Sequence, residues 1–274
     1  MKTTIIESRL TGKKSPETCE DGIVATDDFI AVIDGSTSKA VKQMKPGMRN
    51  GRAAMLLVGE GLQALAPDAT VQQCCDIITN LFQDAYRQYG VDLNRLIAHP
   101  EERMTASAAI YSCLRHEVWM VGDCQCLVDG IYHDNPKPDE DRIAHERAAI
   151  IHEMLAKGEA DVASLQQHDV GRDRVVAQIV QTCHDQNVRF SVFDGFPVAM
   201  DKVKVIPVPL GSKVVLATDG YPFLLPTLEE SEAALAKQLS TDPLCIHHHI
   251  ATKALMDGQL SFDDRAYVRF EGEI

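Results

Sequence analysis

The pattern of hydrophobic and polar residues predicts several helices. In residues 47–66, hydrophobic residues recur every three or four positions, which places them on one face of a helix. Residues 70–89 repeat this pattern. Further helices are expected at residues 139–157, 172–186, 228–239 and 243–257.

Short apolar runs bounded by turn residues predict strands. Residues 23–34 contain two such runs joined at Asp27 and Asp28, and residues 105–114 and 118–130 predict a hairpin. More apolar runs follow at residues 189–195, 202–208, 213–220 and 266–272. Strands that alternate with pairs of helices are typical of an α+β fold. We expect a four-layer α-β-β-α sandwich, in which two antiparallel sheets pack face to face with helices outside.

Length and composition predict one domain without a membrane helix. No repeat or long linker divides the 274 residues, so we expect a single domain over residues 1–274. No stretch reaches the roughly 18 consecutive apolar residues of a membrane helix, and the first residues lack the apolar core of a signal peptide. A cytoplasmic protein is therefore expected. Its eight cysteines predict buried thiols, not a disulfide framework.

The net charge of −13 argues against nucleic-acid binding, because neutralising phosphates takes Lys and Arg residues. The charge does not identify a partner. Part of the acidic excess can belong to carboxylates whose charge is offset by bound cations, which a residue count does not reveal.

Acidic residues stand where several predicted strands begin or end. Asp-Gly occurs six times, and a turn is the default interpretation of any single copy. Asp34 and Asp219, however, each end a strongly apolar strand, and Asp123 ends a third. The acidic pairs at 20–21 and 263–264 directly precede further strands. Carboxylates gathered at one place would repel one another unless they surround cations, and all-oxygen ligands favour Mg²⁺ or Mn²⁺.

The order of these motifs resembles that of a known enzyme family. From residue 19 to residue 268 the chain contains CEDG, FIAVIDGSTS, MTASAAIYS, MVGDCQC, VVLATDGYP and SFDDRAYV. These blocks are similar to the motifs E-D, A-V-x-D-G, G-S-T-A, V-G-D-S-R, L-x-S-D-G and D-N or D-D of the metal-dependent protein serine/threonine phosphatases, the PPM or protein phosphatase 2C family. The resemblance implies a hydrolase of phosphoserine and phosphothreonine that uses two Mg²⁺ or Mn²⁺ ions.

The resemblance implies a role for each acidic position. Asp34 would bridge the two ions, the backbone carbonyl of Gly35 would bind beside it, and Asp21 would bind directly or through water. Two cations about 4 Å apart lower the pKa of a bridging water and neutralise phosphoryl oxygens, so that no side-chain nucleophile is needed. Asp34 and Asp219 are the residues expected to be essential for catalysis.

The resemblance also implies ligands that come later in the chain. Asp219 and Asp263 would hold the second ion, with Asp264 as the substitute for Asp263. Asp123 matches a position that can bind a third, weaker ion. The expected cofactors are therefore two Mg²⁺ or Mn²⁺ ions and a third, more weakly bound ion at Asp123.

One part of the family pattern is missing. The family usually has an Arg shortly before E-D that binds the substrate phosphate, whereas this chain has Lys13 and Lys14. A Lys binds phosphate as a point charge, without the planar fork of Arg. We expect Lys13 and Lys14 to bind substrate, with Arg9 and Arg49 as the next candidates, and His99 is a candidate acid for the leaving group.

Three functions stay open at this point. The first is a phosphatase of phosphoproteins, and the second is a phosphatase of a small phosphorylated metabolite on the same scaffold. The third is a binding or sensing module without catalysis. The acidic residues at strand ends argue against the third, because a site without catalysis has no physical need for clustered like charges. Metal binding separates the first two functions from the third.

Overall fold

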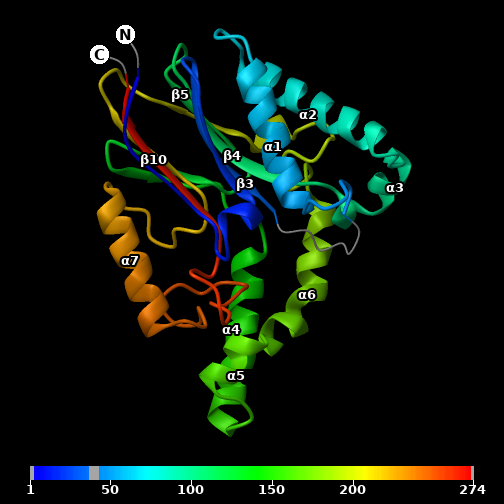
Figure 1. Cartoon of the computed structure of the whole chain (residues 1–274), viewed down its shortest axis with the longest axis vertical. Coiled ribbons are helices and arrows are strands. Elements are labelled where there is room, and N and C mark those ends of the chain that lie inside the picture. Colours follow the sequence, from blue (N-terminus) through cyan, green and yellow to red (C-terminus); the bar gives the residue numbers. More distant parts are fainter. Residues whose placement is uncertain (1–2, 37–42, 273–274) are drawn as a thin grey trace.

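The computed structural model describes residues 3–36 and 43–272, which build two five-stranded antiparallel sheets (Figure 1). The first sheet has the order β1 (Thr4–Thr11), β10 (Arg265–Glu271), β9 (Lys213–Ala217), β6 (Gln125–Val128) and β7 (Ile131–His133). The second has the order β2 (Asp21–Ala25), β3 (Phe29–Gly35), β4 (Ala106–Ser112), β5 (Glu117–Val121) and β8 (Lys204–Pro207). The predicted α+β sandwich of two antiparallel sheets is confirmed.

The apolar run of β3 shows why the sandwich has four layers. Ile30 and Val32 point into the core between the two sheets, whereas Phe29, Ala31 and Ile33 pack against helices on the outer face. A strand covered on both faces needs apolar residues at every position, because successive side chains point to opposite sides. The sequence FIAVI meets that need.

Helices cover the outer face of each sheet. On the second sheet these are α1 (Asn50–Ala64) and α2 (Val71–Gln88), followed by the short α3 (Leu93–Ala98). On the first sheet it is α7 (Leu228–Thr241), at the left in Figure 1. Of the helices that the structure describes in residues 3–36 and 43–272, none has the length and hydrophobicity to span a lipid bilayer. The single-domain organisation stays a prediction.

A helical segment extends beyond one end of the sandwich. It consists of α4 (Glu140–Lys157), α5 (Val162–Gln167) and α6 (Val170–Thr182), at the bottom of Figure 1. The fully buried Arg147 of α4 pairs with Asp169 at 2.8 Å, and it donates hydrogen bonds to the backbone carbonyls of Leu244 and Ala251. The helical segment is thus tied to the loop that precedes β10.

Two sequence predictions of secondary structure are wrong. Residues 243–257 form a loop instead of a helix, because the carboxylate of Asp242 accepts the backbone N–H groups of Ile246, His247 and His248 and fixes an irregular path. Residues 189–195 form no strand and only isolated bridges at Phe190 and Phe193. In both places the buried apolar residues belong to loops, so a hydrophobic run there does not indicate a helix or a strand.

Two further boundaries differ from the prediction. The run 118–130 is two strands, β5 and β6, which belong to different sheets because the chain breaks at Gly122 and Asp123. The edge strand β1 was not predicted, since most of its residues are exposed and no apolar face marks it. Seven of the eight cysteines are buried, as the sequence predicted, and Cys183 is partly buried.

Candidate metal centre

The acidic residues at the strand ends come together at one end of the sandwich. Asp21 and Asp34 lie directly opposite each other in the ladder of β2 and β3. Asp219 follows β9 of the other sheet, and Asp123 follows β5. The site therefore lies where the ends of both sheets meet. A sandwich of this kind brings together residues nearly 200 positions apart because they share one end of two packed sheets.

Three of these carboxylates are close enough to bind one ion. Asp34, Asp123 and Asp219 each offer an oxygen, and these oxygens lie within 4.8 Å of one another. Asp21 is 3% exposed, and its Oδ2 has no hydrogen-bond partner among the residues that the structure describes. A buried oxygen without a partner is costly unless a cation completes its coordination. These residues therefore fit a hard divalent cation.

The pKa values show that part of this charge is uncompensated. Burial and then the nearby Asp219 and Asp123 raise the pKa of Asp34 to about 8. Burial and then the Asp34 charge raise the pKa of Asp21 well above its usual range, although Thr218 lowers it by a hydrogen bond. A bound cation would reverse both shifts, because it favours the ionised carboxylate. We call Asp21, Asp34 and Asp219 the inner carboxylates.

Asp123 differs from the inner carboxylates because protein groups already hold both of its oxygens. Ser107 Oγ donates to Oδ1 at 2.6 Å, and the Lys137 ammonium lies 2.5 Å from Oδ2. Burial alone would raise the pKa of Asp123, but the charge and hydrogen bond of Lys137, together with Ser107, hold that pKa below its usual value.

Asp263 and Asp264 are also held by protein groups. Asp263 forms ion pairs with Lys253 and with Lys13, the latter at 3.0 Å. Asp264 accepts the backbone N–H groups of Lys13 at 2.7 Å and of Glu20 at 3.1 Å, so it fixes the chain that leads into β2. We call Asp123, Asp263 and Asp264 the paired carboxylates. Since Asp264 is engaged by backbone, the geometry favours Asp263 over Asp264 as the ligand, which stays a prediction.

Gly35 lies beside Asp34 at the point where α1 begins. A Cβ at this position would lie 2.2 Å from the carbonyl oxygen of Gly51 and 2.6 Å from that of Glu20. The requirement for glycine therefore comes from close backbone packing. The sequence block that follows Gly35 includes Thr37 and Ser38, which lie outside the described residues.

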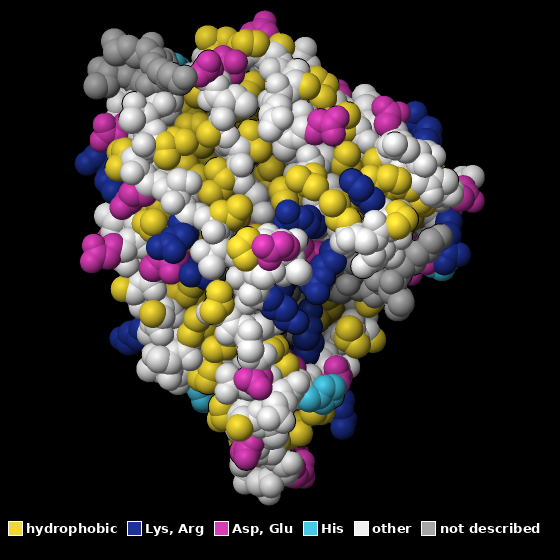
Figure 2. Space-filling view, viewed as in Figure 1, with side chains coloured by type: hydrophobic (Ala, Val, Ile, Leu, Met, Phe, Trp, Pro, Cys, Tyr) yellow, Lys and Arg dark blue, Asp and Glu magenta, His cyan; other side chains and the backbone are white. Residues whose placement is uncertain are grey.

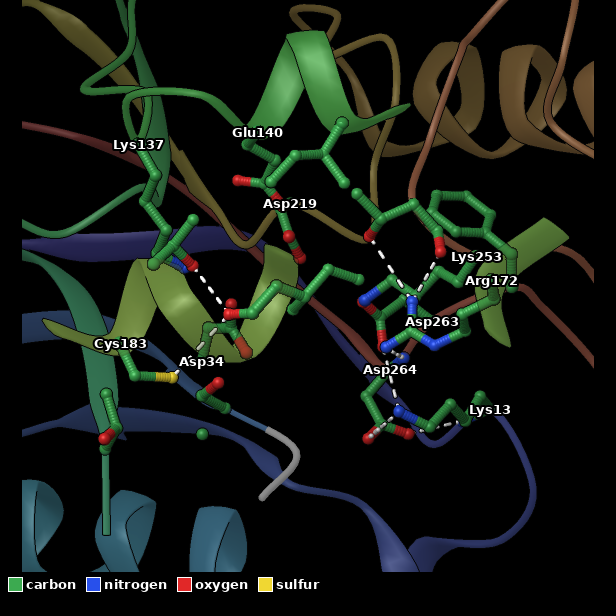
Figure 3. Close-up of a pocket in the computed structure, with 18 of the residues that line it drawn as sticks. Lys13, Asp34, Lys137, Glu140, Arg172, Cys183, Asp219, Lys253, Asp263 and Asp264 are labelled. Atoms are coloured by element: carbon green, nitrogen blue, oxygen red, sulfur yellow. Dashed lines mark hydrogen bonds and ion pairs between the residues drawn. The ribbon is translucent and has the colours of Figure 1, made fainter. Parts of the chain in front are cut away.

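Five of these carboxylates line a cavity of about 270 Å³ (Figure 3), namely Asp21, Asp34, Asp219, Asp263 and Asp264. Its basic side chains are Lys13, Lys137, Arg172 and Lys253. Figure 3 shows Lys137 approaching from one side, while Lys13, Lys253 and Arg172 gather near Asp263 and Asp264 on the other. The apolar wall comes largely from the helical segment and the loop before β10, and it contains Ile143, Ile179, Phe190, Met256 and Phe262. On the surface, Lys and Arg side chains gather across the middle of one face (Figure 2).

Several cavity residues were missed from the sequence. Lys137 and Glu140 were not singled out from the sequence, yet both line the cavity. Arg172 and Lys253 were not singled out, because one lies in a helix and the other in a segment wrongly predicted to be helical. A weak signal existed at Lys137, since a lysine between two prolines has a restrained backbone.

The predicted phosphate-binding residues lie in different surroundings. Lys13 lines the cavity, whereas Lys14 is exposed and does not. Arg9 is exposed on β1, and the side chain of Arg49 is 43% exposed with its Nη1 3.9 Å from Glu20. His99 pairs with Glu101 at 3.1 Å outside the cavity. Of these five candidates, only Lys13 is in the cavity.

No family model and no curated protein matches the chain. Similar solved structures include the PPM Ser-Thr phosphatase MsPP from Mycobacterium smegmatis in complex with cacodylate, with 13% identity, a TM-score of 0.47, and coverage of 99% of this chain and 100% of that one. PppA of Pseudomonas aeruginosa, a regulatory component of T6SS, has 9% identity and a TM-score of 0.47, with 98% and 97% covered.

A third similar structure is the catalytic domain of the serine threonine protein phosphatase PstP with two manganese ions. It has 13% identity and a TM-score of 0.44, and 97% of this chain and 96% of that one are covered. Two of these three structures are described as serine/threonine phosphatases. The roles of individual residues in this chain are argued from its own geometry.

Proposed function

We propose that this chain is a metal-dependent phosphatase that hydrolyses phosphoserine and phosphothreonine monoesters on proteins. One observation carries the proposal: Asp21, Asp34 and Asp219 line one cavity together with basic side chains, and burial and like charge raise the pKa values of Asp21 and Asp34. Carboxylates bind the ions, and fixed cations bind the phosphate. A phosphoryl-transfer site needs both.

In this proposal Asp34 would help to hold both ions, because it is central among the inner carboxylates. It stands across the ladder from Asp21 and within 4.8 Å of Asp219 through their nearest oxygens. Two bound Mg²⁺ or Mn²⁺ ions would supply an activated water and neutralise phosphoryl oxygens. Asp21 and Asp219 would fix the ions on either side of Asp34, and Asp263 is the fourth proposed ligand.

The protein's own cations would bind the phosphate oxygens. Lys13, Lys253 and Arg172 lie together in the cavity and offer donors from one side. Of these only Arg172 has the planar fork that suits phosphate, and it already donates to the backbone carbonyl of Thr252. Apolar side chains such as Ile143 and Phe190 would exclude bulk water from the ester, which strengthens each charge interaction.

A small phosphorylated metabolite is the second candidate substrate. The cavity of about 270 Å³ lies near the lower end of the range for small-molecule sites. Its apolar wall, with Ile179 and Phe262, suits the body of a small ester as well as the residues beside a phosphoserine. Rates on a phosphopeptide panel and on a panel of phosphorylated metabolites, measured side by side, distinguish the two.

Hydrolysis of a generic aryl phosphate tests the proposed activity itself. The purified full-length chain is assayed with Mn²⁺, with Mg²⁺ and with an excess of chelator. We expect turnover only with a divalent ion, since the inner carboxylates alone would repel the phosphate. Full activity in excess chelator would show that the acidic cluster serves another purpose.

A further inference from the structure

Lys137 lies at the metal centre, although it belongs to the loop between β7 and α4 and not to the end of a strand. Its ammonium is 2.5 Å from Asp123 Oδ2, and Ser107 holds the other oxygen of Asp123 at 2.6 Å. Asp123 is nevertheless close enough to Asp34 and Asp219 to share an ion with them. An ion bound there would have to displace the Lys137 ammonium or lie directly beside it.

The loop that carries Lys137 is held on both sides. The lysine stands between two prolines, whose rings fix the backbone φ angle. Before it, the Asn135 side chain donates to the carbonyl of Lys202 at 3.1 Å. After it, the carboxylate of Asp139 pairs with Arg189 at 2.5 Å. The ammonium is therefore positioned by the fold itself, independently of any ligand.

The surroundings of Lys137 are almost entirely acidic. Asp123, Glu140, Asp34 and Asp219 all contribute to the negative field around the ammonium. The side chain is only 23% exposed, so solvent screens this field weakly. Moving such an ammonium away from its carboxylate would leave both charges uncompensated in a half-buried site.

We propose that Lys137 is a built-in cation that takes the place of a metal ion at Asp123. Metal ions are then confined to the inner carboxylates and Asp263, and the centre holds two ions instead of three. The inference rests on the proposed function in one respect, namely that the inner carboxylates bind metal ions. It is an alternative to the expectation that Asp123 binds a third ion, which stays a prediction.

Counting Mn²⁺ ions bound to the full-length chain by equilibrium dialysis, without substrate, tests the proposal. We expect two ions for the natural sequence and for Lys137→Arg, which keeps the positive charge. Lys137→Ala should bind one additional ion, because it exposes Asp123. Lys204→Ala is the matched control, since Lys204 is an exposed lysine that pairs with Asp134, and its count should stay at two.

The double variant Lys137→Ala, Asp123→Asn assigns the additional ion to Asp123, and its count should return to two. Should Lys137→Ala be unstable, Lys137→Gln keeps the side-chain length without the charge and should gain the same ion. Mn²⁺ should also raise the melting temperature of either variant more than that of the natural sequence, because the ion replaces a lost charge.

Two results would overturn the inference. One is a third ion bound by the natural sequence, and the other is an unchanged count in both Lys137→Ala and Lys137→Gln. Either leaves the proposed phosphatase intact, because two or three ions still occupy the inner carboxylates. Absence of any Mn²⁺ binding is a different result, and it overturns the proposed function together with the inference.

Discussion

The inner and the paired carboxylates lie at the same end of the sandwich, yet their charges are balanced in different ways. Asp123 and Asp263 face lysines, and Asp264 accepts backbone N–H groups. Asp21 and Asp34 have raised pKa values because burial and like charges oppose their ionisation. Protein groups already engage the paired carboxylates, of which Asp263 is also a proposed ligand, whereas Asp21 and Asp34 need a bound cation to favour their ionised form. Acidity at a strand end alone does not make that distinction.

The largest expected effect is the loss of turnover in Asp34→Asn. Asp34 is the central inner carboxylate, so replacing it removes the proposed bridge between the ions while the shape of the side chain is kept. Hydrolysis of an aryl phosphate in saturating Mn²⁺ should fall to the background rate. Asp68→Asn, at an exposed position, is the control and should keep full activity. Substantial turnover by Asp34→Asn would remove Asp34 from the site.

Stability should change in opposite directions in the two groups. Without metal at pH 7, Asp34→Asn should raise the free energy of unfolding by about 4 kcal/mol, because the natural sequence has to take up a proton at Asp34 when it folds. Asp264→Asn should lower it by about 2–3 kcal/mol, because charge-assisted hydrogen bonds to two backbone N–H groups are weakened. Urea unfolding in excess chelator measures both. If both variants changed the free energy of unfolding in the same direction, the inner and the paired carboxylates would not differ as described.

The pH dependence of stability sharpens the same contrast. The pKa of Asp34 is raised to about 8 in the folded chain from 3.8, so the folded state holds this proton more tightly than the unfolded one. Its contribution to stability is complete below pH 4 and is lost as pH rises through about 8. Relative to Asp34→Asn, the metal-free natural sequence should lose about 4 kcal/mol between pH 5 and pH 8. A constant difference between the two across this range, in chelator, would contradict the raised pKa.

The smallest expected effect separates Lys13 from Lys14. Lys13→Ala should weaken substrate binding by about 1 kcal/mol, which is the scale of one hydrogen bond. The loss should appear mainly in KM if the lysine binds ground and transition states equally. Lys14→Ala should change neither kcat nor KM, since Lys14 is exposed outside the cavity. An effect of Lys14→Ala as large as that of Lys13→Ala would place the phosphate elsewhere.

The sequence predicted the sheets and the acidic strand ends because both are local. The apolar run FIAVI and the Asp34 that follows it are adjacent in the chain, so this short stretch alone predicts a strand that ends on a carboxylate. The identity of the inner carboxylates depended on the ladder that sets Asp21 opposite Asp34, which a hairpin pattern makes predictable. The sandwich then brings Asp219 to the same place.

The cations of the cavity could not be predicted in this way. Lys253 lies in a loop whose path depends on backbone hydrogen bonds to Asp242, and hydrophobic spacing there mimicked a helix. Lys137 meets Asp123 because the loop between β7 and α4 is held by contacts with residues far along the chain, Arg189 and Lys202. Neither position has a periodic signal, so only the tertiary arrangement reveals which lysine faces which carboxylate.

The close backbone contact between Gly35 and Gly51 limits which substitutions the chain can accept at these two positions. A methyl group at position 51 would lie 2.6 Å from the carbonyl oxygens of Gly35 and Ser36 and from Glu20 Oε1. The replacement of glycine by alanine, mild on most helices, would here push the start of α1 away from the strand that carries Asp34. Related sequences can therefore vary in helical faces, loops and cavity lysines. Replacing either glycine would displace the backbone beside Asp34.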